Sequence, residues 1–168
     1  MNAFVAPSQG RSHLTAGLAV AVLVLVLDQV TKWWILDVVM QPFPRVIEVT
    51  PFFNLVLVWN YGVSFGTFAS EAAYMPYVLS AISIGIAGFL VVWMRQAENR
   101  LTALALGLVV GGALGNVVDR LLYGAVADFL DFHVAGWHFW AFNVADSGIT
   151  VGVALLVIDG LFRSHETS

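Results

Sequence analysis

Hydrophobic residues fall in four long runs that are separated by shorter polar stretches. The runs cover about residues 14–36, 72–94, 101–122 and 141–162. A helix needs about 20 mostly apolar residues to cross the hydrocarbon core of a bilayer, and each run is long enough. The pattern therefore predicts one integral membrane domain, residues 1–168, with four transmembrane helices. An even number of spans places both termini on the same side.

The pattern changes between the first two runs, at about residues 42–68. The stretches "VIEVT" and "FNLVLVW" are rich in β-branched and aromatic residues, and Pro51 lies between them. This composition predicts two short strands. Because an open sheet edge is not tolerated in hydrocarbon, we expect them at the outer surface, packed on the spans. The expected fold class is an all-α membrane protein with four transmembrane helices and a small β-like platform between helices 1 and 2.

The basic residues indicate the orientation. Arg11 precedes the first span, Arg95 and Arg100 flank the turn between the second and third, and Arg163 follows the fourth. Short cytoplasmic segments are rich in Lys and Arg, so the termini and that turn are expected inside. A cleaved signal peptide over residues 11–27 is the alternative. "DQVTKWW" follows instead of a small-x-small cleavage site, which favours a retained span.

Composition narrows the class of protein. The chain is 60% hydrophobic and 11% charged, whereas soluble domains carry about 25% charged residues. It has no cysteine, so disulfides, thiol nucleophiles and thiolate metal sites are excluded. The net charge is −4 and no basic run is present, so no nucleic-acid partner is expected. His133 and His138 have no evident third ligand, so no metal site is expected.

Polar residues gather at the outer ends of the last two spans. The same i, i+3, i+4 spacing occurs as Asn116, Asp119 and Arg120 in the third span, and as Asn143, Asp146 and Ser147 in the fourth. In a helix this spacing puts each set on one face. The two spans are antiparallel neighbours, so the two faces should meet at the outer surface. An ionisable residue in such a segment is a functional candidate.

Asp128 and Asp146 are the strongest catalytic candidates. Neither has a basic residue three or four positions away. If they meet in a partly desolvated site, they share one proton, and the pair can activate water and protonate a carbonyl. Asp131 could compete with Asp128 for this role. The rival classes are a small channel or transporter with an aspartate relay, and a non-enzymatic assembly factor. The predicted strands argue against a pore.

Other polar and small residues have structural explanations. Three pairs have the spacing or adjacency of structural ion pairs: Asp28 with Lys32, Asp119 with Arg120, and Asp159 with Arg163. For Asp28 and Lys32, contact with a substrate is an equal alternative. Gly107, Gly111 and Gly115 recur every four residues and predict one smooth face for close helix packing.

Five sequence blocks resemble those of the lipoprotein signal peptidase (signal peptidase II) family. They are "DQVTK" at 28–32, "NYGVSFG" at 60–66, "GGALGNVVDR" at 111–120, "VADF" at 126–129 and "FNVADSGI" at 142–149. They occur in the family's order and spacing. Ala127 stands where many members have valine, and "GVSF" replaces the commoner "GAAF"; both changes are mild.

The resemblance implies a bacterial inner-membrane aspartyl endopeptidase with an active site facing the periplasm. Its substrate would be a diacylglyceryl-modified prolipoprotein, cut just before the lipidated cysteine. Asp128 and Asp146 match the catalytic pair. No cofactor or metal is implied, because two carboxylates and water suffice. The partners would be the lipidated prolipoprotein and membrane lipid, and a monomer is expected.

The resemblance also assigns supporting residues. Those matching substrate-binding or site-supporting positions are Asp28, Lys32, Asn60, Gly62, Asn116, Asp119, Arg120 and Asn143. Asn60 and Gly62 match a β-like loop that cradles the substrate. Asn60 has an equal structural alternative, which is to cap the turn before Gly62.

Overall fold

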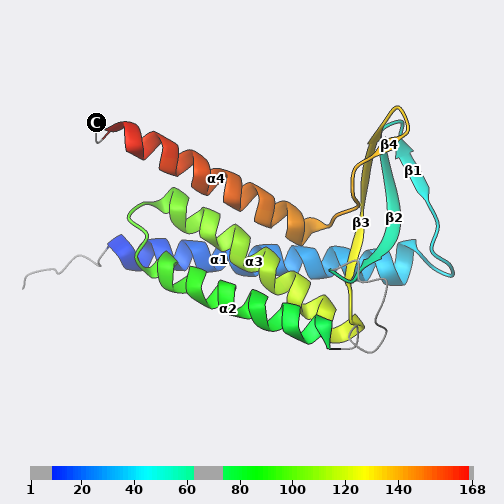
Figure 1. Cartoon of the computed structure of the whole chain (residues 1–168), viewed down its shortest axis with the longest axis horizontal. Coiled ribbons are helices and arrows are strands. Elements are labelled where there is room, and N and C mark those ends of the chain that lie inside the picture. Colours follow the sequence, from blue (N-terminus) through cyan, green and yellow to red (C-terminus); the bar gives the residue numbers. More distant parts are fainter. Residues whose placement is uncertain (1–8, 63–73, 167–168) are drawn as a thin grey trace, which may run out of the picture.

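The structure, a computed structural model, describes residues 9–62 and 74–166, with side chains for 13–62 and 74–162. Its helices are α1 (Gln9–Trp34), α2 (Met75–Arg95), α3 (Arg100–Tyr123) and α4 (Val144–Glu166), and α1 continues as a π-helical turn, η1 (Ile35–Val39) (Figure 1). These 4 helices are long and apolar enough to cross a membrane. The expected four-helix membrane fold is confirmed. The expected start of the second span, at residue 72, and residues 63–68 of the platform lie outside the described residues.

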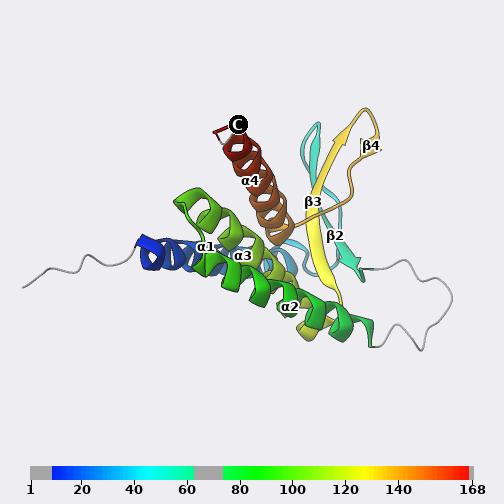
Figure 2. The ribbon, with the colours of Figure 1, turned by 60° about the vertical axis from the view of Figure 1, so that its left-hand side comes forward.

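Helix α3 is the centre of the bundle. In its most apolar window 61% of the residues are buried, against 11% to 22% in the other spans. Helices α1, α2 and α4 all pack on α3, while α2 and α4 make little contact with each other in the described part of the chain. Figures 1 and 2 show α2 and α4 on either side of α3. Helix α3 therefore lies between α2 and α4 and contacts both of them.

Small residues allow α3 to approach two neighbours closely. A side chain added at Gly107 would meet the carbonyl oxygen of Gly17 in α1, and one at Gly112 would meet the carbonyl oxygen of Ala145 in α4. Backbones this close pack with little lost space, as small-residue faces allow in membranes. The expected packing face of α3 therefore meets α1, and a second small-residue face meets α4.

A four-stranded antiparallel sheet covers the end of the bundle that we call the outer end. Its strands, in spatial order, are β1 (Ile47–Thr50), β2 (Phe53–Asn60), β3 (Val126–Val134) and β4 (Trp137–His138). The first two are the strands expected from the sequence. The other two lie between α3 and α4, in a segment expected to be a loop. The strands run across the helix axes (Figure 1).

Strand β3 begins just after Gly124 terminates α3. Gly124 ends α3 in the left-handed conformation (φ 75°) and donates its N–H to the Arg120 carbonyl. A glycine in this conformation is the usual helix terminator. Only Ala125 separates Gly124 from Val126, so β3 leaves directly from the end of a span and its first residues are held close to the membrane surface.

The close α1–α3 contact predicts a matched pair of variants. Gly107→Val forces a side chain into the α1 backbone, and overpacking of this kind costs about 1–3 kcal/mol. The thermal midpoint in detergent should fall. Gly88→Val in α2 is the control, because a side chain there meets nothing within 4 Å. Equal midpoints for the two variants would contradict the packing described for α3.

Candidate active site

Asn143 and Asp146 form the start of α4. The Asn143 Oδ1 accepts the Asp146 N–H at 3.0 Å, and the Asp146 carboxylate accepts the Asn143 N–H at 3.3 Å. This reciprocal pair is a capping box, which satisfies N–H groups left open at a helix start. These polar residues therefore cap the outer end of the membrane-spanning helix α4, and this cap fixes Asp146 there.

Amide side chains connect Asp146 to Asp128 on β3. Asn143 Nδ2 donates to Asp128 Oδ1 at 2.7 Å, and Asn116 Nδ2 donates to Asp146 Oδ1 at 2.8 Å. Asn60 Nδ2 donates to the second oxygen of Asp128 at 3.0 Å. Asn143 thus bonds to both aspartates, and residues from β2, β3, α3 and α4 meet in one network.

A buried ion-pair cluster lies beneath the two aspartates. The Lys32 Nζ is 2.8 Å from Asp28 Oδ2 and 2.9 Å from Asp119 Oδ2, and all three side chains are at most 3% exposed. Lys32 also donates to Asn116 Oδ1 at 3.2 Å. The expected pair of Asp28 with Lys32 is present. In the described residues Asp119 forms its ion pair with Lys32 and not with the neighbouring Arg120, contrary to the structural pair expected there.

Each carboxylate of this cluster holds backbone next to one of the two aspartates. Asp28 Oδ1 accepts the Ala145 N–H at 2.9 Å, and Ala145 directly precedes Asp146. Asp119 Oδ2 accepts the Ala127 N–H at 3.0 Å, and Ala127 directly precedes Asp128. The Asp28–Lys32–Asp119 cluster therefore fixes the two chain segments that carry the candidate pair.

Gln29 is a member of the site that sequence reasoning missed. Its Nε2 lies within hydrogen-bond distance of Asp28 Oδ2, Asp119 Oδ1 and the Gly115 carbonyl, at 3.1, 3.0 and 3.2 Å. It cross-links α1 to α3 beside Lys32. Its position in the "DQVTK" block was the only available signal, because nothing in a single sequence separates it from a lipid-facing polar residue.

Burial gives Asp128 an unusual titration. Asp128 is only 2% exposed, and this burial raises the pKa of its carboxyl to about 6. The hydrogen bonds from Asn60 and Asn143 oppose the rise in pKa, and the negative charge of Asp146 adds to it. A raised carboxyl pKa beside a second carboxylate is the condition for one proton to be shared between them.

Asp131 lies away from the pair. Successive side chains of a strand point to opposite faces, so Asp128 and Asp131 lie on opposite faces of β3. Asp131 accepts hydrogen bonds from His138 Nδ1 at 2.9 Å and Asn54 Nδ2 at 3.0 Å. Burial by itself would raise the pKa of Asp131, but these two hydrogen bonds hold it below its usual value. Among the described residues no three His, Cys, Asp or Glu side chains converge on a possible metal site.

Asn60 and Gly62 form a turn beside Asp128. Asn60 Oδ1 accepts the Gly62 N–H at 2.8 Å, so Asn60 caps this turn while its amide holds Asp128. Gly62 has φ +84°, and a Cβ there would lie 2.5 Å from Leu79 Cδ1 of α2. Only glycine adopts this conformation freely. The capping role considered from sequence is present, and the bond to Asp128 was not foreseen.

Arg120 lies near the same turn. Its Nη2 is 3.9 Å from the position of a Cβ on Gly62, and its Nη1 makes only a long 3.5 Å bond to the Asn116 carbonyl. Its Nε is buried without a hydrogen-bond partner in the described structure. A half-buried guanidinium with an unsatisfied donor is suited to bind an added carbonyl or carboxylate.

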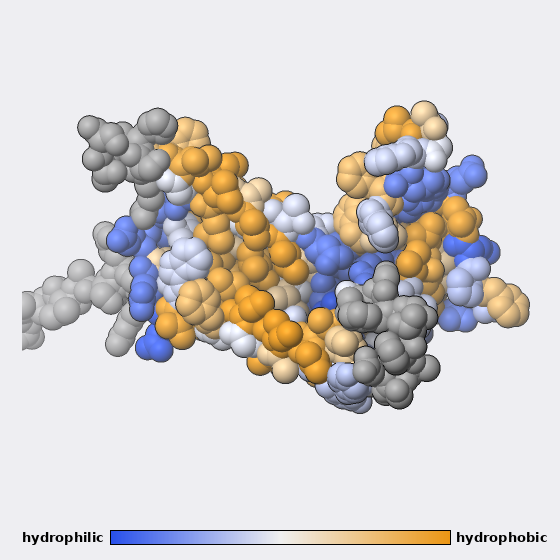
Figure 3. Space-filling view, viewed as in Figure 1, coloured by the Kyte–Doolittle hydropathy of each residue, from blue (hydrophilic) through white to orange (hydrophobic). Residues whose placement is uncertain are grey.

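The surface is hollowed between α4 and the sheet. Figure 3 shows hydrophilic residues in this hollow and apolar surface along the adjoining helices. Exposed apolar residues along these helices include Ile82, Ile86 and Phe89 of α2, and Val153 and Val157 of α4. The polar site thus adjoins surface that is suited to lipid or to another apolar helix.

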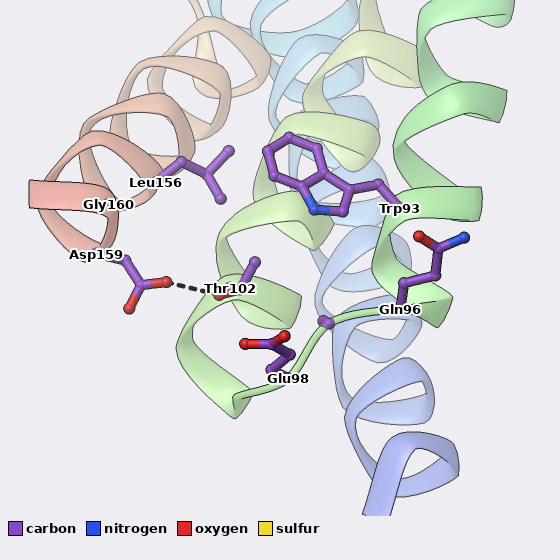
Figure 4. Close-up of a pocket in the computed structure, with 8 residues that line it drawn as sticks. Trp93, Gln96, Glu98, Thr102, Leu156, Asp159 and Gly160 are labelled. Atoms are coloured by element: carbon purple, nitrogen blue, oxygen red, sulfur yellow. Dashed lines mark hydrogen bonds between the residues drawn. The ribbon is translucent and has the colours of Figure 1, made fainter. Parts of the chain in front are cut away.

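Asp159 lies at the opposite, inner end. It accepts hydrogen bonds from Thr102 Oγ1 at 2.7 Å and Asn99 Nδ2 at 3.2 Å, which tie α4 to the start of α3. Beside it is a cavity of about 390 Å³ that Trp93 and Glu98 also line (Figure 4). The side chain of Arg163, its expected partner, is outside the described side chains. The bonds to α3 are structural, which agrees with the role expected for Asp159.

The fold and this site define a class of protein: a multi-pass membrane protein with two aspartates brought together at one end of its helices. The comparisons with known proteins narrow the class. A family model described as signal peptidase (SPase) II matches residues 20–162. The chain belongs to this family of aspartic proteases, which removes signal peptides from prolipoproteins in bacterial membranes.

Known proteins are similar to this one over most of the chain. The lipoprotein signal peptidase of Methylobacterium sp. (strain 4-46) is 46% identical over 146 residues, covering 87% of this chain and 88% of that protein. The one from Burkholderia vietnamiensis is 45% identical over 156 residues, covering 92% of each. A solved bacterial membrane enzyme matches with a TM-score of 0.75 and 34% identity, over 90% of this chain and 91% of that one.

The raised pKa of Asp128 predicts a pH-dependent stability. Its pKa is about 6 in the fold and about 3.9 in an unfolded chain. Between these values the folded state binds more protons, so this carboxyl destabilises the fold as the pH rises. As the pH rises from about 4.5 to about 7.5, the free energy of unfolding of Asp128→Asn should fall less than that of the wild type, by on the order of 2 kcal/mol.

Asp131→Asn gives a control of opposite sign. Its folded pKa is lowered, so the Asp131 carboxylate contributes stability above its unfolded pKa that is lost in acid. Thermal midpoints in detergent measure Asp128→Asn between about pH 4.5 and about pH 7.5, and Asp131→Asn at neutral pH and in acid below its unfolded pKa of about 3.9, where its contribution is lost. Asp128→Asn and Asp131→Asn changing in the same direction at neutral pH would contradict the charge environments described.

Proposed function

We propose that Asp128 and Asp146 are the catalytic pair of this peptidase. The observation that carries the proposal is that Asn143 donates to both carboxyls, from its side chain to Asp128 and from its backbone N–H to Asp146, while the Lys32 cluster holds the backbone before each. Asp128, with the raised pKa, holds the shared proton, and Asp146 is the ionised member. This assignment gives one base and one acid side by side.

The reaction then needs only water. Asp146 takes a proton from a water molecule, whose oxygen attacks the scissile carbonyl carbon, and Asp128 gives its proton to the carbonyl oxygen. The tetrahedral diol then collapses as the C–N bond breaks: Asp146 gives the proton it took from water to the leaving amine, and Asp128 takes a proton from a diol hydroxyl as the new C=O forms. The pair returns to its singly protonated state, and no cofactor takes part.

We infer that the substrate is a prolipoprotein carrying a diacylglyceryl group, cut just before the lipidated cysteine. The hollow between α4 and the sheet adjoins apolar surface of α2 and α4, which supports entry from the bilayer by both the acyl chains and the signal-peptide helix. An extended peptide could bond to the turn at Asn60 and Gly62. Arg120 has an unsatisfied donor for a substrate carbonyl.

The proposed arrangement in the cell follows from the same features. The basic residues at the termini and at the α2–α3 turn support a cytoplasmic location for both, with the sheet and the pair facing the periplasm from the inner membrane. Both aspartates and their supports come from one chain, which supports an active monomer. The sheet is built from two separate connections between spans, which supports a single domain.

Replacing either aspartate tests the proposal. Asp128→Asn or Asp146→Asn should each lower the cleavage rate of a lipidated precursor in detergent or proteoliposomes by about 10³-fold, because the acid or the base is lost. Asp159→Asn is the matched control, since Asp159 lies at the inner end, where it accepts hydrogen bonds from Thr102 and Asn99 at the start of α3.

The control variant should cleave at close to the wild-type rate. Folding of all three variants is checked by their thermal midpoints and their insertion into membranes. An Asp146→Asn protein that is folded and cleaves normally would remove Asp146 from the mechanism. Equal losses in all three variants would show that the effect is not specific to the pair.

A further inference from the structure

The free end of the sheet exposes an unusual number of large apolar side chains. We define the sheet tip as Phe52 in the β1–β2 turn, Val134 and Trp137 in the β3–β4 hairpin, and Phe139 and Trp140 just after it. Their exposed fractions are 55%, 74%, 75%, 66% and 92%. Apolar side chains concentrated in this way on the surface usually mark an interaction site.

The sheet near the tip has one apolar face and one polar face. Phe132 shares a face of β3 with Val134 and Asp128, and its ring packs against Phe53 and Phe142 with centroids 4.8 and 5.9 Å away. The residues of the other face are polar: Glu48, Asn54, Asp131, His133 and His138. Most of them line an open cavity of about 480 Å³.

The apolar face is turned toward the membrane. Asp128, on this face, bonds to Asn143 at the first turn of α4, so the face looks along the axis of a membrane-spanning helix toward the bilayer. The polar face lies on the side away from α4. The sheet therefore has the two-sided character of a structure that lies on a membrane surface.

The depth of the tip follows from how β3 is attached. The strand starts at Val126, just after α3 ends at Tyr123, and its middle is bridged to Phe142, just before α4 begins. Figures 1 and 2 show the strands running across the helices, so following β3 to the tip does not lead away from the membrane plane. The headgroup layers add about 5–7 Å to each side of the hydrocarbon core, deep enough to contain a sheet lying flat.

We propose that the sheet tip is a membrane anchor that inserts its apolar side chains into the headgroup–acyl boundary of the outer leaflet. The partner is the phospholipid surface itself. Tryptophan and other aromatic side chains favour this boundary. The tip is continuous with an interface already defined, since Trp140 lies four residues before the membrane-spanning segment Val144–Phe162. The anchor holds the sheet against lipid whether or not Asp128 and Asp146 are catalytic.

The absence of cysteine makes a direct test simple. Single cysteines are introduced at Val134 and Trp140 of the tip, labelled with a nitroxide, and the protein is reconstituted in phosphatidylcholine–phosphatidylglycerol vesicles without substrate. Power-saturation electron paramagnetic resonance then compares contact with oxygen, which partitions into lipid, and with a water-soluble nickel complex. Glu48→Cys on the polar face is the aqueous control, and Val153→Cys on the exposed surface of α4 is the hydrocarbon control.

The expected oxygen-to-nickel ratio at positions 134 and 140 lies between those at 48 and 153. A ratio equal to that at position 48 would overturn the proposal. Spin–spin broadening at position 140 that disappears on dilution with unlabelled protein would show that a second copy covers the tip instead. A ratio that rises only when a lipidated precursor peptide is added would make the tip a substrate surface. If Trp140→Cys fails to insert, position 134 gives the same comparison alone.

Discussion

The whole outer half of the molecule depends on one buried ammonium group, that of Lys32. It lies between the carboxylates of Asp28 and Asp119 in a part of the protein from which water is excluded. Removing charges from water is unfavourable unless they are paired and their remaining bonds are satisfied. Here the backbone N–H groups of Ala145 and Ala127 supply those bonds. The need to satisfy buried charge therefore also positions the backbone of α4 and β3.

This arrangement requires the helices to approach closely. A Cβ at Gly115 would lie 2.6 Å from Asp28 Oδ2, so the charge cluster fits only because that position has no side chain. Gly111 and Gly107 do the same for the backbones of α1 and α3, about one and two turns further in. The series of glycines in α3 thus connects packing in the bilayer to the geometry of the site, since it brings Lys32 within reach of Asp119.

The sequence predicted the features that are periodic or local. Long apolar runs predict spans, and the i, i+3 spacing of Asn143 and Asp146 predicts a shared position at a helix start. The partner of Asp119 was not predictable, because its ion pair with Lys32 joins residues far apart in the sequence, as does the bond from Ala145 to Asp28, which are 117 residues apart. Strands β3 and β4 were missed because their aspartates and glycine suggest a loop. The choice between Asp128 and Asp131 depended on the alternation of β3, which requires knowing that the segment is a strand.

The central claim is that Lys32 and its two carboxylates act as one unit that positions Asp128 and Asp146. A double-mutant cycle on the turnover rate of a lipidated precursor, with Lys32→Met and Asp119→Asn, tests it most directly. The claim predicts strong coupling: the double variant should lose far less activity than the product of the two single losses. Expressed as a coupling free energy, the difference should be about 1–3 kcal/mol. Losses that simply multiply, in proteins that remain folded, would show that Lys32 and Asp119 act independently and would contradict the claim.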